Sequence, residues 1–164
     1  MTKAEQFYEG QNKLAEYDKQ TNKLVKRALR YFGDVQSEHF TLPEMVYLLR
    51  NSYKERLTHM KVLGEKEMRT NNDLSSGFCL ITSYLIYSMT GGDKVWELRG
   101  ARPIHWWLVH KQTNKILDIT HSQFKLFTLR HLVQNGSAFD IKDEQFMDLL
   151  KQKAHALAQC AGLE

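Results

Sequence analysis

The hydrophobic pattern of the chain changes near residue 70, and this change limits the folds open to it. Before residue 70, apolar residues recur at intervals of three, four and seven, which is the spacing of an amphipathic helix. We expect one long helix from about Ala4 to Tyr31. A second helix is predicted after Thr41-Leu42-Pro43-Glu44, where a hydroxyl cap, an early proline and a glutamate satisfy the first amides. The stretch from Leu57 to Arg69 is polar and ambiguous.

After residue 70 the residues are typical of a mixed structure. Turn residues lead into an apolar segment that should form a helix beginning at Phe78 or Cys79 and ending at Gly91-Gly92. Runs rich in Val, Ile and Trp follow and predict three antiparallel strands: Val95 to Arg99, Ile104 to His110 and Ile116 to Thr120. A final helix is expected from Asp140 to Gln159.

This order of elements predicts an α+β fold. Residues 1–70 should form an N-terminal helical segment packed on a core made by residues 71–164. A chain of 164 residues fits one compact domain of this kind, or one core with a helical extension.

Composition excludes several classes of protein. With 42% hydrophobic and 26% charged residues, the chain is neither disordered nor collagen-like. No apolar run is long enough to span a bilayer, and the first residues lack the apolar stretch of a secretory signal, so we expect a cytoplasmic protein without a membrane partner. Cys79 and Cys160 match neither a disulfide scaffold nor a zinc pattern, so each is expected to be a free thiol.

Positive charge is concentrated in the predicted first helix. The net charge is +4 and the pI is about 9.0, and one stretch holds six basic residues against only Glu16 and Asp18. These six are Lys13, Lys19, Lys23, Lys26, Arg27 and Arg30. Two interpretations are open: a solvated helix face, or a surface for an acidic protein or a nucleic acid.

The candidate chemistry rests on Cys79, His105 and Asp118, because Walker, dinucleotide-binding, zincin and nucleophile-elbow motifs are absent. Cys79 lies at a predicted helix start, where the helix dipole and the first amides favour a negative sulfur and can receive an oxyanion. An imidazole would take the thiol proton, and a carboxylate would hold the ring in the useful tautomer.

Strand register decides whether His105 and Asp118 can meet. A four-residue turn from Lys111 to Asn114 would pair His105 with Thr120, which places Asp118 diagonal to His105 on the same sheet face. A shift of one residue would move the carboxylate to the opposite face. The sequence leaves both registers open.

Three segments resemble the transglutaminase-like branch of papain-like thiol enzymes: Ser76-Gly77-Phe78-Cys79, His105-Trp106-Trp107-Leu108 and Leu117-Asp118-Ile119-Thr120. They are also similar to small uncharacterised bacterial and phage proteins that carry Gly-x-Cys, His-Trp-Trp-Leu, Asp-Pro-Thr and Gln-Phe. The resemblance implies a helix bearing Cys79 on an antiparallel sheet that presents His105 and Asp118. The sequence departs from the pattern at Leu80, where transglutaminases often have Trp, and at Ile119, which replaces Pro. No calcium site is implied.

Other residues near these motifs have two interpretations each. Asn72, Ser75 and Ser76 could donate to an oxyanion, and the alternative for the two serines is helix capping. Trp106 and Trp107 must point to opposite sheet faces, so that one fills the core and the other walls a substrate cleft, or both are structural.

A metal site is the alternative to thiol chemistry in this region. Its ligands would be His105, His110, Asp118 and His121, but the first two lie on opposite faces of one strand, so we expect no metal and no cofactor.

The sequence therefore predicts acyl transfer through Cys79, His105 and Asp118 on an amide or ester substrate, a protein being one candidate. Water would make the reaction a hydrolysis and an amine would make it a transamidation. The alternative is a non-catalytic binding or inhibitory protein that uses its basic N-terminal helix. The sequence predicts no oligomeric state.

Overall fold

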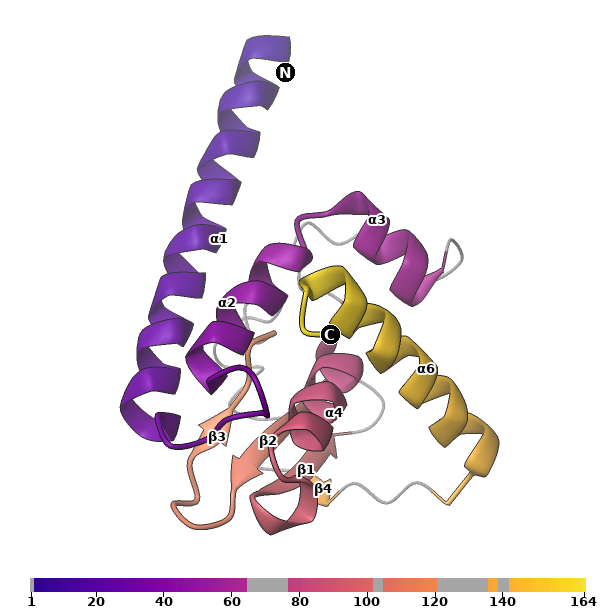
Figure 1. Ribbon diagram of the computed structural model, residues 1–164. Helices are drawn as coiled ribbons and strands as arrows, with labels where there is room; N and C mark the ends of the chain where they lie inside the picture. Colours follow the sequence, from indigo (N-terminus) through magenta and orange to yellow (C-terminus); the bar gives the residue numbers. More distant parts are fainter. Residues whose placement is uncertain (1, 65–76, 102–104, 121–135, 139–141) are drawn as a thin grey trace.

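The computed structural model describes residues 2–64, 77–101, 105–120, 136–138 and 142–164 (Figure 1). Helices pack over a small antiparallel sheet, so the predicted α+β class is confirmed. The central helix is α4 (Cys79–Met89). It contacts strands β1 (Trp96–Ala101) and β2 (His105–His110) on one side and helix α6 (Glu144–Ala161) on another.

The two N-terminal helices follow the predicted pattern. Helix α1 (Lys3–Phe32) begins with a capping box between Thr2 and Glu5. Helix α2 (Leu42–Ser52) begins with the expected box between Thr41 and Glu44 and packs beside the second half of α1. The first half of α1 extends beyond the rest of the molecule, and Leu14 is 46% exposed (Figure 1).

The polar stretch after α2 forms short helical turns. Helix α3 (Arg56–Thr58) continues into a π-helical turn, η1 (His59–Leu63), which stops at Gly64 with a φ of 80°. The remainder of the ambiguous stretch lies outside the described residues. At the other end of the chain, α6 starts after an Asp143 cap and ends at Gly162, which is left-handed.

The sheet has the order β3-β2-β1-β4, with β3 at Ile116–Leu117 and β4 at Ser137–Ala138. A 3-10 turn, η3 (Gly92–Lys94), leads from α4 into β1. Strand β4 was not predicted, because a strand of two residues is too short to show an alternation of apolar and polar residues. Strand β3 is shorter than expected, because Asp118 and Thr120 bond to each other and turn the chain after Leu117.

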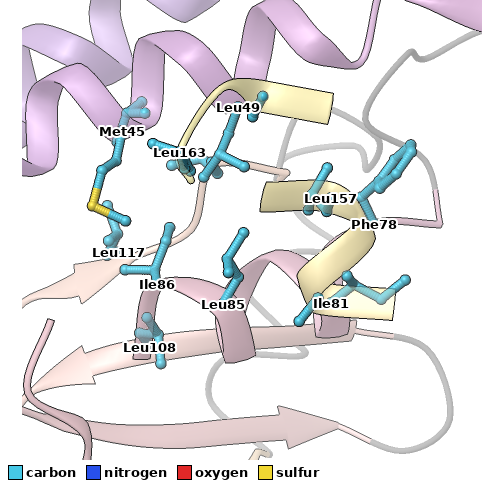
Figure 2. Packing of buried hydrophobic residues seen from close by; sticks show 14 of the residues in the cluster. Met45, Leu49, Phe78, Ile81, Leu85, Ile86, Leu108, Leu117, Leu157 and Leu163 are labelled. Carbon is cyan, nitrogen blue, oxygen red and sulfur yellow. The ribbon is translucent and has the colours of Figure 1, made fainter. Parts of the chain in front are cut away.

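One hydrophobic core joins the residues before and after position 70. Figure 2 shows Met45 and Leu49 of α2 facing apolar side chains of α4, the sheet and the C-terminal segment. The same buried cluster contains Phe78, Ile81, Leu85, Ile86, Leu108, Leu117, Leu157 and Leu163. Helix α4 therefore has a fixed position between the sheet and the other helices. None of the described helices has the length and apolar content needed to cross a membrane.

Gly100 is required by the close approach of Trp106 across the β1–β2 pair. A Cβ at position 100 would lie 1.8 Å from a carbon of the Trp106 ring. Gly100→Ala is therefore expected to lower the free energy of unfolding by about 3 kcal/mol, the upper part of the usual range for overpacking. Urea denaturation measures this loss. In a Trp106→Leu background the same substitution should cost much less, and an equal cost in both backgrounds would contradict the contact.

Candidate active site

Cys79 is the first residue of α4, and two neighbours fix this helix start. Gly77 has a φ of 88°, which turns the chain into the helix. Phe78 is fully buried and stacks on Tyr53, with ring centroids 4.6 Å apart. The Cys79 side chain follows at the helix N-terminus and is 8% exposed. The sulfur therefore lies where the helix dipole favours negative charge.

His105 is the first residue of β2 and is fully buried. Its ring stacks on Trp107, two residues along the same strand, with centroids 5.8 Å apart and planes 26° apart. Because alternate residues of a strand share a face, this contact fixes the orientation of the imidazole.

The Asp118 carboxylate contacts His105 with one oxygen and Thr120 with the other. Its Oδ2 bonds to His105 Nε2. Its Oδ1 accepts from the Thr120 amide at 3.1 Å and from the Thr120 hydroxyl at 3.2 Å. With both oxygens engaged, the carboxylate is held in one orientation against the ring.

The strand register is the one that a four-residue turn predicts. Val109 pairs with Ile116 and Leu108 with Leu117, and the His110 amide donates to the Lys115 carbonyl. Continued along the strands, this register places Asp118 diagonal to His105. The alternative register, shifted by one residue, is excluded.

The charges of the site stabilise a protonated His105. Burial lowers the pKa of the imidazole, but its hydrogen bond to the Asp118 carboxylate and its interactions with Asp118 and Cys79 raise the pKa to about 9. The Asp118 carboxylate after β3 bonds directly to the ring, and Cys79 at the start of α4 is close enough to the ring to influence its pKa. The structure therefore places His105 in contact with Asp118 and within electrostatic reach of Cys79.

Comparison of the chain with family models, with curated proteins and with solved structures found no match.

Arg50, which the sequence analysis did not single out, supports the site from α2. It is fully buried, and its guanidinium lies 3.8 Å from the centre of the Tyr17 ring. Its Nε donates to the Thr21 hydroxyl and its Nη1 to the Ile119 carbonyl, both at 3.0 Å. Since Ile119 follows Asp118, this side chain ties the carboxylate-bearing turn to α1 and α2. Its sequence signal is a charged residue on the apolar face of a predicted helix.

Tyr53 is a second buried polar residue beside the site. Its hydroxyl shares a hydrogen bond with Thr82, one turn after Cys79 on α4. Burial raises the pKa of this phenol, and the charges of Cys79 and Asp118 raise it further, while the Thr82 bond and Arg50 oppose the shift. Tyr53 is therefore a neutral hydroxyl that joins α2 to the cysteine helix.

The other candidate site residues have different outcomes. Trp107 is fully buried against His105, and Trp106 is 9% exposed, lies over Gly100 and accepts from Ser83 through its carbonyl at 3.4 Å. Both tryptophans make packing contacts in the described structure. Asn72, Ser75 and Ser76 lie outside the described residues.

Of the four ligands of the metal alternative, His105 and Asp118 meet in the described structure, but His110 does not join them. His110 packs against Phe32 and Trp96, and its Nδ1 pairs with the Thr113 hydroxyl at 3.0 Å. His121 lies outside the described residues. Within the described ranges, no group of three or more His, Cys, Asp and Glu side chains is placed to hold a metal ion.

A shallow hollow lies at the opposite end of α4 from Cys79. It is lined by Ser37, Glu38, His39, Phe40, Met89 and Leu163. It contains none of the three candidate catalytic residues.

Proposed function

We propose that this protein is a thiol-dependent acyl-transfer enzyme with a core of the transglutaminase-like and papain-like type. The single observation that carries the proposal is the His105 ring, which bonds to Asp118 and also interacts with the Cys79 thiol at a helix N-terminus. A thiol, an imidazole and a carboxylate in this order are the groups needed for nucleophilic attack by sulfur.

In the first half of the reaction, the Cys79 thiolate attacks the carbonyl carbon of an amide or ester. The amides at the start of α4 receive the developing oxyanion. The His105 imidazolium gives its proton to the departing amine or alcohol as the carbon–nitrogen or carbon–oxygen bond breaks. A thioester on Cys79 and a neutral His105 remain.

In the second half, neutral His105 takes a proton from an incoming acceptor, which attacks the thioester and releases the acyl group. Water gives a carboxylic acid, and an amine gives a new amide. We favour hydrolysis, because Leu80 and Ile119 depart from the transglutaminase pattern. Asp118 remains ionised and keeps the ring oriented in both halves.

Alkylation of Cys79 tests this proposal. An ordinary thiol, with a pKa near 8.5, is less than about 1% thiolate at pH 6. An imidazolium beside Cys79 favours the charged sulfur, so iodoacetamide at pH 6 is expected to modify Cys79 at least about tenfold faster than a model thiol. Intact-mass spectrometry over time measures this rate.

Two cysteine variants and one histidine variant serve as controls. The rapidly formed adduct should be absent in Cys79→Ser and still form in Cys160→Ser. Cys160, a partly buried free thiol on α6, is the other cysteine of the chain. His105→Gln should slow the reaction to the rate of a model thiol. If Cys79 in the intact protein reacts no faster than the model thiol at pH 6, Cys79 is not an activated nucleophile and the proposed function is contradicted.

A further inference from the structure

A row of cations follows the outer face of α1. Lys19, Lys23, Lys26 and Arg30 are spaced by four, three and four residues, which places them on one side of a helix, and all four are exposed. The opposite side of the helix carries its buried residues: Tyr17, Thr21, Leu24, Ala28 and Phe32. The row therefore points away from the core.

A second group of cations extends this surface toward the sheet. Arg27, Arg30 and Lys115 surround the Tyr31 ring, at 5.0, 5.1 and 4.8 Å from its centre. Lys115 precedes β3, and Arg27 donates to the Ile116 carbonyl at 3.1 Å. Figure 1 shows β3 beside the C-terminal part of α1. The row and this group together form what we call the basic surface: Lys19, Lys23, Lys26, Arg27, Arg30 and Lys115.

Along the sequence, the acids nearest to the helical row of the basic surface lie beyond its ends, at Glu16 and Asp18 before it and at Asp34 after it. The sequence from Lys19 to Gly33 contains no Asp or Glu, and the preceding acid, Asp18, is paired with Lys54. In the part of the chain that the structure describes, no carboxylate pairs with any of the six cations. Like charges one helical turn apart repel each other, so a bound polyanion would relieve this repulsion.

We propose that the basic surface binds the phosphate backbone of a nucleic acid. The Cβ atoms of neighbouring residues in the row are about 5–6 Å apart, so their side chains leave the helix in a regular line that suits regularly spaced phosphates. The Tyr31 ring is occupied by cations, so it offers no open platform for stacking bases. Binding should therefore be electrostatic, independent of sequence and possible with duplex DNA.

Fluorescence anisotropy with a labelled 20-base-pair duplex at several salt concentrations tests this proposal. Each phosphate contact contributes about −0.9 to the slope of log K against log salt. The triple variant Lys26→Gln/Arg30→Gln/Lys115→Gln is expected to reduce the slope by about 2.7 and to weaken binding at least about tenfold near 0.1 M salt. A duplex of different sequence should bind equally well.

The matched control removes three exposed lysines elsewhere: Lys61→Gln/Lys94→Gln/Lys151→Gln. It has the same net charge as the test variant and should retain the slope of the intact protein. Equal losses in both variants, or no loss in the test variant, would overturn the proposal. Tighter binding of a polyglutamate peptide than of DNA would also overturn it and indicate an acidic protein partner. Cys79→Ala should bind DNA normally, which separates this surface from the proposed enzyme.

Discussion

Arg50→Met is expected to lower the free energy of unfolding by about 3–5 kcal/mol, the cost of breaking a buried charged network. Methionine nearly preserves the volume of the side chain but cannot donate. The Thr21 hydroxyl and the Ile119 carbonyl would both lose the bond that the guanidinium provides at 3.0 Å. The contact of the guanidinium with the Tyr17 ring would be lost as well. Urea denaturation at pH 7 measures the change.

The matched control for this prediction is Arg56→Met, since Arg56 is an exposed arginine of α3. That substitution should change the free energy of unfolding by no more than about 0.5 kcal/mol. A loss below about 1 kcal/mol in Arg50→Met would show that the buried bonds contribute little. Arg50→Met should also slow alkylation of Cys79 at pH 6 under conditions where the variant is folded, because the turn that carries Asp118 loses its anchor.

The parts of the fold that the sequence predicted are those set by local chemistry. The capping box at Thr41 and Glu44 and the glycines after α4 act within one turn of the chain, so their meaning does not depend on distant residues. The β2–β3 register was one of two possibilities. The length of the turn and the alternation of side chains between the two sheet faces defined these two registers. The structure has the register that pairs Val109 with Ile116.

The parts that the sequence did not predict depend on partners far along the chain. Arg50 is buried because Thr21 and Ile119, 29 and 69 residues away, supply its acceptors. The local pattern of apolar and polar residues does not indicate contacts with such distant residues. Likewise, the apolar pattern includes Leu14, which is exposed, because periodicity shows that a helix is amphipathic without showing how much of it reaches the core.

The candidate site was predicted in the same partial way. Cys79 at a helix start follows from the turn residues before it, and the diagonal between His105 and Asp118 follows from one of the two strand registers that the sequence left open. Neither pattern revealed that Thr120 would hold the second carboxylate oxygen or that Trp107 would stack on the imidazole. Both contacts come from residues that the sequence analysis had singled out only as part of a motif or as a cleft wall.

His105 makes the stability of this protein depend on pH in the alkaline range. The pKa of its imidazole rises from 6.5 to about 9 on folding. A group whose pKa is raised on folding stabilises the folded state fully below its unfolded pKa, and this stabilisation is lost as the pH rises through its folded pKa. A shift of this size corresponds to about 3 kcal/mol, since each pKa unit is worth 1.36 kcal/mol.

The free energy of unfolding should therefore fall by about 3 kcal/mol between pH 6 and pH 9.5 through this residue alone. Urea denaturation at several pH values in this interval measures the fall. Other groups also titrate there, so the informative quantity is the difference between the intact protein and His105→Gln, in which this contribution is absent. Equal pH slopes in the two proteins would mean that the imidazolium is not stabilised by Asp118 and Cys79. The proton that His105 is proposed to give to the leaving group would then not be held at neutral pH.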